Sequence, residues 1–441
     1  MSNILPTSAA VAPHADADDA IVVTGMGAIG PFGMTVEALW SALCDGRPLF
    51  VAQPDGKHDD LCGFLPQDDI ATLAAEGNRG ERRSVSLFAH RAANAAIAQA
   101  GLMHGGPDPT NVGIVYGTAN GGTPMNFTTA LEYAAQSSRF ELPSLAIIDD
   151  SMGTPAGLVS HEHQFRGPIL NVPMGWGAGG CALATACDLL RSRVASAVVV
   201  VAADELGGDR PMATRSVNRA RRLLSPNDGG TAGVRPFDRA ANGSTMGEGG
   251  AALVLELRSD ALRRGCRPIV RLSGWAIRTG VARDDVAKYD TRAIAEAMSA
   301  AIGSKSPRCV GAVFSGSHCN PSSDLAESAA VARVFGGRSA ASAPGEPSGD
   351  CAAPLVTNIR GVVGDVGAVT GLYAVIGAAL TINRGVLPGT TGCGMPDERH
   401  DIEIAHRTCR LDDVNAVLCN AFSSDGVYTA VLANAEPVGA F

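Results

Sequence analysis

The segment that decides the fold is Arg235–Glu256, which reads RPFDRAANGSTMGEGGAALVLE. It opens on Arg-Pro-Phe-Asp, passes through Gly-Glu-Gly at Gly247–Gly249, and ends in the apolar run Ala251–Glu256. A short apolar run that follows a glycine-rich stretch is typical of a strand buried on both faces of a sheet. We therefore expect a buried strand at Ala251–Glu256.

Further apolar runs of this kind alternate with amphipathic helices on both sides of the segment. We expect strands at Ile21–Thr24, Val112–Tyr116, Ala197–Ala203, Ile269–Leu272, Ala312–Ser315, Ala416–Cys419 and Tyr428–Leu432. We expect helices at Val36–Cys44, Ser84–Leu102, Thr291–Ile302, Leu325–Phe335 and Gly371–Asn383. This alternation favours an α/β fold with buried parallel strands. Each half of the chain holds the same kind of unit, but periodicity leaves open whether the halves are duplicates.

The composition excludes several classes of protein. Of 441 residues, 46% are hydrophobic and only 18% are charged, which argues against a disordered chain. Basic residues number 35 against 44 acidic ones, and the net charge of −9 argues against nucleic-acid binding by a general basic surface. The apolar runs near Val194–Ala203 and Leu372–Ile382 are shorter than the roughly 20 residues that a membrane helix needs.

The cysteines and the chain ends give expectations about compartment and domains. Eleven cysteines are scattered without a C-x-x-C pair, so we expect no zinc cage. Their odd number and the lack of a secretory segment predict reduced thiols in a cytoplasmic protein. We expect a flexible tail at 1–20, an N-terminal half at 21–257 and a C-terminal half at 258–441.

Three stretches together resemble one family, the β-ketoacyl-acyl carrier protein synthases, or ketosynthases. They are Ile21–Gly33 (IVVTGMGAIGPFG), the segment Arg235–Glu256, and Gly385–Pro388 (GVLP) followed by Asn420 and Gly426. The resemblance covers about Ile21–Ala433. It implies the thiolase fold, an α/β architecture in which two similar halves stack as five layers (αβαβα), usually as a dimer.

Enzymes of this family use a cysteine that accepts the acyl chain from a carrier protein. Counting back from Glu205, the cysteine position falls on Gly177, and on Trp176 if the gap is placed differently. Neither side chain can be acylated, because a covalent acyl carrier needs a nucleophile such as a thiolate.

The family also uses two histidines, which assist decarboxylation and steady the resulting enolate. Counting from Pro321, Asp324 and Glu327, the first histidine position falls on Gly316. Counting back from Gly385, the second falls on Asp365.

Two further family positions are altered as well. Arg360 stands at the family's lysine position, and Ser424 at its gating phenylalanine. With the cysteine and both histidines also replaced, no catalytic group of the family is retained. An anionic Asp365 would oppose an enolate rather than stabilise it.

We expect these altered residues to lie around the family's acyl pocket. The expected pocket residues are Trp176, Gly177, His318, Asp365 and Ser424. Trp176 would fill the space that the absent catalytic side chains leave. A buried ion pair between Arg360 and Asp365 would replace the catalytic polar network. We expect no cofactor and no metal.

Two features of the sequence admit sharper alternatives. A relocated nucleophile, Cys181 or Cys319 acting with His318, would make the chain an active acyltransferase or condensing enzyme. We favour buried structural thiols and a loop histidine without a partner. The spacing of His161 and His163 could place both imidazoles on one face of a strand, but a metal site would need a third ligand.

The resemblance is strongest to the chain-length-factor subunit of type II polyketide synthases. Such subunits keep the fold, lose the cysteine and pair with an active ketosynthase, whose acyl tunnel they shape in polyketide, polyene or fatty-acid-like biosynthesis. We expect this chain to be inactive alone and to act in a heterodimer that an acyl carrier protein visits. Because carrier proteins are acidic, Arg221 and Arg222 are candidate docking residues. The alternative of a different class is a module that only binds the carrier.

Overall fold

The computed structural model describes residues 20–52, 61–76, 84–103, 106–121, 135, 151–205, 223, 225, 233–280, 289–337 and 353–437. Nearly all of the expected tail, residues 1–19, lies outside the described residues, so the division of the chain at 20 and 257 remains a prediction. No helix among the described residues is long and apolar enough to cross a membrane.

The first half of the chain, in the part that the structure describes, supplies five strands of the main sheet, the short pair β2–β3 and five α-helices. Its elements are β1 (Ile21–Ile29), α1 (Val36–Asp45), β2 (Val51–Ala52), β3 (Leu61–Cys62), α2 (Gln67–Glu76), α3 (Ser84–Ala100), β4 (Val112–Gly117), α6 (Thr154–His163), β5 (Ile169–Val172), α7 (Ala178–Arg191), β6 (Ala197–Glu205) and β7 (Glu248–Leu257), with the 3₁₀ turns η2 (Pro109–Asn111) and η3 (Gly175–Gly177).

The second half repeats this plan. Its elements are α9 (Arg258–Arg263), β8 (Val270–Thr279), α10 (Thr291–Ile302), η4 (Pro307–Cys309), β9 (Ala312–Phe314), α11 (Pro321–Phe335), β10 (Leu355–Thr357), α13 (Arg360–Val363), α14 (Val369–Arg384), β11 (Val386–Leu387), β12 (Glu403–Ile404), β13 (Cys409–Arg410), β14 (Ala416–Phe422) and β15 (Val427–Asn434). The expected helix at Thr291–Ile302 is confirmed with the same bounds.

The sheet topology shows that the halves are duplicates. In the first half the strands lie in the order β1-β7-β6-β4-β5, with two antiparallel pairings followed by two parallel ones. In the second half the order β8-β15-β14-β9-β10 has the same sequence of pairings. A short antiparallel contact of Ile21–Val23 on β1 with Val270–Leu272 on β8 joins the two halves. The topology therefore answers what periodicity left open.

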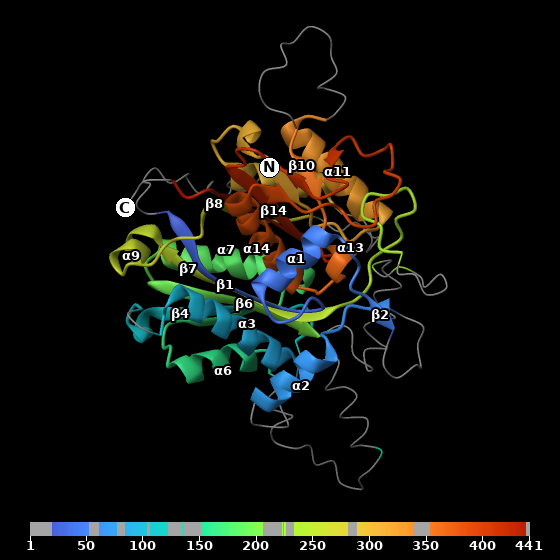
Figure 1. The fold of residues 1–441 in the computed structure, drawn as a ribbon. Coiled ribbons are helices and arrows are strands. Elements are labelled where there is room, and N and C mark those ends of the chain that lie inside the picture. The colour runs from blue at the N-terminus through green and yellow to red at the C-terminus, as the bar shows by residue number, and fades with distance from the viewer. Residues whose placement is uncertain are drawn as a thin grey trace, which may run out of the picture.

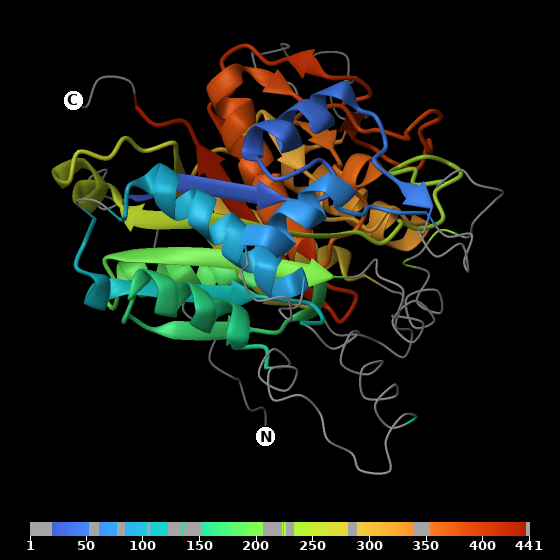
Figure 2. The same cartoon turned by 60° about the horizontal axis from the view of Figure 1, so that its bottom comes forward.

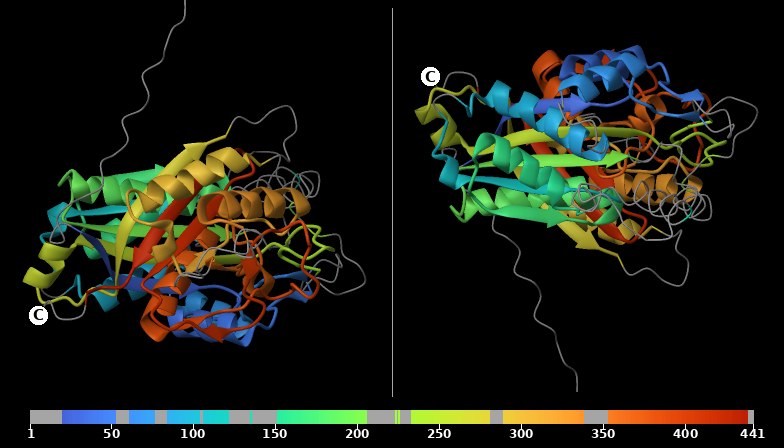
Figure 3. Two further views of the ribbon diagram at one scale, coloured as in Figure 1. Left: turned by 90° about the horizontal axis from the view of Figure 1, so that it is seen from above. Right: turned by 90° about the horizontal axis from the view of Figure 1, so that it is seen from below.

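The helices complete five layers. Helices α7 and α14 lie between the two halves of the sheet, and each packs on strands of both halves. Helices α3 and α6 cover the outer face of the first half, and α10 and α11 that of the second. Figure 1 shows the first half below the orange and red second half, and Figure 2 shows the same stack tilted. Figure 3 shows the two outer layers, from above and from below.

Two glycines of β1 allow α3 to approach the sheet. The sequence predicts a strand that closes at Gly25-Met26-Gly27, but β1 runs on to Ile29 with a register shift between Val23 and Gly25. A Cβ at Gly25 would lie 2.0 Å from the carbonyl oxygen of Ala96, and one at Gly27 would lie 1.9 Å from that of Ala92. These glycines therefore serve close packing and do not form a turn.

The expectation that His161 and His163 lie on a strand is wrong, because both belong to helix α6. Residues two apart on a helix do not share a face. His163 instead contacts Asn94 of α3, at 2.7 Å between Nε2 and Oδ1. Among the described residues, no group of three His, Cys, Asp or Glu side chains is arranged to hold a metal ion.

Replacing Gly27 by Ala tests the close packing of α3 on β1. Because the new Cβ would overlap the backbone of α3, we expect Gly27→Ala to lower the free energy of unfolding by about 1–3 kcal/mol. The matched control is Gly157→Ala in α6, where nothing lies within 4 Å of the added Cβ. There the better helix propensity of Ala should raise stability by about 0.5–1 kcal/mol. Equal effects in urea denaturation would contradict the packing argument.

Candidate functional site

The site is built on the loop Ser315–His318, which follows β9 and is fastened by a buried carboxylate of α11. Glu327 accepts hydrogen bonds from Ser315 Oγ (2.5 Å), the backbone N–H groups of Gly316 (3.1 Å) and Ser317 (3.0 Å), and Asn420 Nδ2 (2.8 Å). Burial raises the pKa of Glu327, and these donors oppose that shift. Three of the four donors belong to this loop, which carries Gly316, the predicted first histidine position.

A second buried carboxylate, Asp324, holds the same loop from one turn earlier on α11. It accepts from Ser317 Oγ at 2.6 Å and from the backbone N–H of Phe237 at 2.7 Å. Burial raises the pKa of Asp324 to about 7, although its hydrogen bonds act in the opposite direction. Phe237 belongs to the segment Arg235–Glu256, so Asp324 connects that segment to the site.

His318 is the buried centre of the site. Its Nδ1 donates to Asp365 Oδ2 at 2.8 Å, and its Nε2 lies 3.2 Å from the carbonyl oxygen of Phe422. Its side chain has 0% exposure. Burial lowers the pKa of His318, and Asp365 opposes the shift. The expectation of a loop histidine without a partner is therefore wrong, because Nδ1 pairs with Asp365.

Asp365 is held between His318 and Arg360. Arg360 Nε lies 3.2 Å from Asp365 Oδ2, which confirms the expected ion pair, and Arg360 Nη1 donates to the carbonyl oxygen of Ser317 at 2.8 Å. Burial would raise the pKa of Asp365, but Arg360 and His318 hold it below its ordinary value. The backbone of Asp365 pairs with Thr245 and Gly247 of the segment Arg235–Glu256.

Two aromatic rings enclose His318. The ring of Trp176 meets it edge-on, with centroids 6.2 Å apart, and the ring of Tyr289 lies 5.8 Å away at a tilt of 35°. Trp176 is 7% exposed. The structure thus brings together Trp176, His318, Arg360 and Asp365 as expected. Tyr289 was missed, since it precedes α10 without any motif around it.

The two glycines predicted to stand at catalytic positions have different surroundings. Gly177 is the last residue of η3, directly before α7. A Cβ there would lie 3.5 Å from Val427 Cγ1, which is an ordinary contact. A Cβ at Gly316 would lie 3.0 Å from the backbone carbon and oxygen of Asn420. A side chain therefore fits at Gly177, whereas Gly316 is pressed against β14.

The candidate relocated nucleophiles are poorly suited to catalysis. Cys181 lies within α7, and burial raises the pKa of its thiol to about 11. Burial, with Asp324 nearby, also raises the pKa of Cys319, whose Sγ lies 3.9 Å from Asn358 Oδ1. Nucleophilic attack needs the thiolate, which neither group supplies near neutral pH.

Of the remaining predicted residues, the structure describes Ser424 but not Arg221 and Arg222. Ser424 is half-buried in the turn between β14 and β15, next to Ser423, whose Oγ accepts from the backbone N–H of Asp425 at 3.2 Å. Arg221 and Arg222 lie outside the described residues, so their role in docking remains a prediction.

A further buried carboxylate near the site was also missed. Asp204, at the end of β6, accepts from Thr118 Oγ1 (2.8 Å) and from the backbone N–H groups of Ala119 (3.0 Å), Asn120 (3.0 Å) and Ala368 (2.8 Å). Ala368 directly precedes α14, so Asp204 connects the two halves beside the site. The only sequence signal was an acidic residue that ends a very apolar strand.

The two carboxylates of α11 predict different responses to isosteric amides. Glu327 accepts backbone N–H groups on both oxygens, so the new amide nitrogen of Glu327→Gln must face a donor. We expect a loss of about 1–3 kcal/mol in the free energy of unfolding. Asp324→Asn can still accept from Phe237 while its amide donates to the Ser317 hydroxyl, so its loss should be below about 1 kcal/mol. Guanidinium denaturation measures both, and a larger loss in Asp324→Asn would contradict this assignment of donors.

Comparison with known proteins is consistent with this geometry. Residues 18–261 match the family model described as "Beta-ketoacyl synthase, N-terminal domain". A putative β-ketoacyl synthase 1 of oxytetracycline polyketide synthesis from Streptomyces rimosus is 29% identical over 433 residues, covering 93% of this chain and 96% of the relative.

Two solved structures share the fold. The ishigamide ketosynthase/chain length factor has a TM-score of 0.80 at 19% identity, covering 96% of this chain and 100% of that one. A type II polyketide synthase acyl-carrier protein in complex with its ketosynthase has a TM-score of 0.79 at 19% identity, covering 95% and 100%. The family model matches more than half of this chain, and the chain has the thiolase fold of ketosynthases. The chain therefore belongs to the β-ketoacyl synthase family.

Proposed function

We propose that this chain is a non-catalytic ketosynthase-like subunit of the chain-length-factor type. It pairs with an active β-ketoacyl-ACP synthase and shapes the acyl tunnel of that partner, in the biosynthesis of a polyketide, polyene or fatty-acid-like product. The observation that carries the proposal is the content of the site. Glycines stand at the positions of the nucleophile and of one histidine, and Asp365 stands at the position of the other.

The electrostatics of the site support the proposal. Condensation requires donors or positive charge directed at a developing enolate. Here the charge of Arg360 is matched by Asp365 at 3.2 Å, and His318 is engaged by Asp365 and by the carbonyl oxygen of Phe422. Arg360 and His318 therefore both have partners within the protein. The type II ketosynthase relatives and the ketosynthase/chain length factor structure support a ketosynthase-like protein, which is the broader class to which the proposed subunit belongs.

The edge of the sheet supports pairing with another subunit. Within the described residues, β5 pairs with β4 on one side only, so its other backbone edge is available to a partner strand. Ile169 and Leu170 on β5 are 41% and 38% exposed, and the nearby Met174 is 43% exposed. Exposed apolar groups along a free strand edge are typical of an obligate interface. We propose that the catalytic ketosynthase covers this edge.

Charge placed on β5 should disrupt the pairing. We expect Ile169→Asp to reduce, by roughly tenfold or more, the amount of a co-expressed ketosynthase from the same organism that co-purifies with the chain. The control is Val51→Asp on β2, an equally drastic change at a side chain that is 54% exposed. A wild-type chain that purifies as a stable homodimer and ignores the ketosynthase would overturn the proposed function.

Intact-mass measurement separates this proposal from an active enzyme with a relocated nucleophile. After incubation with acyl-loaded carrier protein, we expect no acyl adduct on Cys181 or Cys319 of the wild-type chain, because burial raises the pKa of both thiols and keeps them protonated. Gly177→Cys should gain one thiol that iodoacetamide modifies, since a side chain fits there at the start of α7. It should still not condense, because both histidines are absent. An adduct on the wild-type chain that disappears in Cys181→Ala or Cys319→Ala would establish the alternative.

A further inference from the structure

The outer layer of the second half carries an unusual excess of positive charge for an acidic chain. Around helix α10, the elements β8, α10, η4 and α11 with their connecting turns bear the basic residues Arg271, Arg278, Arg292, Lys305, Arg308 and Arg333. Among the carboxylates that the structure describes on these elements and directly before α10, Asp324 and Glu327 are buried, Asp290 is half-buried and Glu296 is exposed. We call this surface the α10 basic face.

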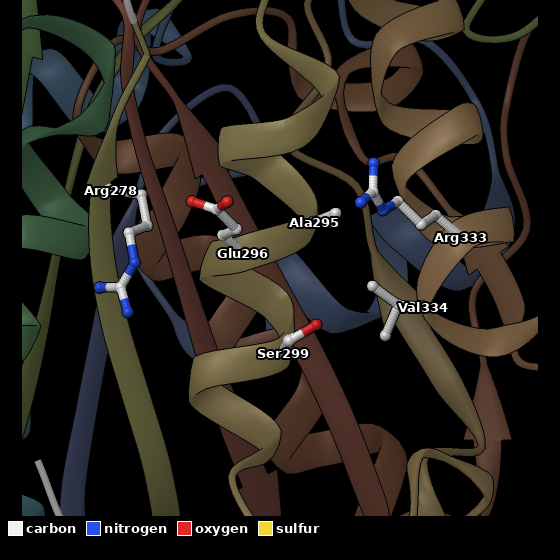
Figure 4. A pocket seen from close by; sticks show the side chains of 6 residues that line it. All are labelled: Arg278, Ala295, Glu296, Ser299, Arg333 and Val334. Carbon is white, nitrogen blue, oxygen red and sulfur yellow. The ribbon is translucent and has the colours of Figure 1, made fainter. Parts of the chain in front are cut away.

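A hollow lies in the middle of the α10 basic face. It has a volume of about 360 Å³ and is lined by Arg278, Ala295, Glu296, Ser299, Arg333 and Val334. Figure 4 shows α10 running through the centre, with Arg278 of β8 on one side and Arg333 of α11 on the other. The small side chains of Ala295 and Ser299 leave the space between the two guanidinium groups open.

The two arginines at the hollow remain available to outside acceptors. Glu296, the carboxylate in the hollow, pairs with Arg292 one turn away on α10, at 2.7 Å. Arg278 donates from Nη1 to the carbonyl oxygen of Ile277 at 2.9 Å. Neither Arg278 nor Arg333 forms an ion pair with any carboxylate in the described part of the chain. Both residues are exposed, so they can turn toward an approaching anion.

We propose that the α10 basic face is a docking surface for the acidic acyl carrier protein, an inference that rests on the proposed function. A helix of the carrier would lie along α10 and present carboxylates to Arg278 and Arg333. Each guanidinium can bind a carboxylate through two parallel hydrogen bonds. The net charge of −9 repels an acidic partner from most of the surface, so the basic face also selects where the carrier lands. Arg221 and Arg222 are the competing location.

Charge pairs at an exposed surface act mainly on the rate of association and weaken with salt. The Debye length is about 8 Å at physiological ionic strength, so steering by this face depends on low salt. Dissociation, which depends on buried contacts, should change less. This gives the inference a kinetic signature that a general loss of structure would not produce.

The test is carrier binding to the purified complex of this chain with its ketosynthase. Surface plasmon resonance at two salt concentrations compares wild type with Arg278→Glu/Arg333→Glu. We expect the double variant to weaken binding roughly tenfold or more, mostly through the association rate, and to lose most of the salt dependence. The control Arg47→Glu/Arg263→Glu makes the same change in net charge at two exposed arginines of other elements. A melting temperature close to that of wild type verifies that each variant is folded.

Each outcome of this test is decisive. If the control weakens binding as much as Arg278→Glu/Arg333→Glu does, net charge is responsible and the docking surface is refuted. If Arg221→Glu/Arg222→Glu abolishes binding while Arg278→Glu/Arg333→Glu leaves it unchanged, the carrier docks elsewhere and the proposed function stands. If no stable complex with a ketosynthase forms, the proposed function fails. In that case, carrier binding to this chain without a ketosynthase tests docking at the α10 basic face independently of the proposed function.

Discussion

The two halves of the molecule depend on a close contact in the central layer that larger residues would prevent. A Cβ at Gly179 of α7 would lie 2.1 Å from the carbonyl oxygen of Ala368, and one at Gly180 would lie 2.0 Å from Thr429 Oγ1. Gly371 of α14 is similarly tight, 3.0 Å from the Cβ of Ala421. With glycine at these positions, two helices fit between two layers of strands. Much of the glycine content of this chain therefore serves packing density.

The same contact places the site. Gly177 immediately precedes α7, and Asp365 lies just before α14, so the central layer brings two catalytic positions of the family together. Asp204 strengthens this junction, because it accepts hydrogen bonds from the loop after β4 and from Ala368 at the start of α14. Buried carboxylates that collect backbone donors recur on both sides of the site, with Asp204 in the first half and Glu327 in the second. They hold the loops around the site in place through their backbone N–H groups.

Local patterns predicted local structure well and tertiary contacts poorly. The helix Thr291–Ile302 could be found because apolar residues recur on one face, and Asp290 caps it by accepting two backbone N–H groups. The length of β1 could not be predicted, because Gly25 and Gly27 are typical of a turn. Only the structure shows that α3 packs against these two glycines. The helix that carries His161 and His163 was misassigned for a related reason, because a two-residue spacing alone does not reveal the backbone that holds it.

In the site too, contacts between residues close in sequence could be predicted, and contacts between distant residues could not. Arg360 and Asp365 are five positions apart, so their pairing could be expected from the sequence. His318 is 47 residues from Asp365 in the chain, and its buried partners depend on how α11 and β14 pack. Motif counting predicted the nucleophile and first-histidine positions at Gly177 and Gly316 from the anchors Glu205 and Pro321. It gave no information on Tyr289 or Asp204, which reach the site through the fold alone.

The surroundings of the two catalytic glycines decide how far this site is from an active one. At Gly177 a Cβ would make only an ordinary contact, so packing does not forbid the nucleophile. At Gly316 a Cβ would press on the backbone of Asn420 at 3.0 Å, and Glu327 already fixes that loop through three hydrogen bonds. A histidine there would have to displace β14 or the loop. If the chain is non-catalytic as proposed, an active site would need coupled changes in the backbone and in the Arg360–Asp365 pair, and one substitution at Gly177 would not suffice.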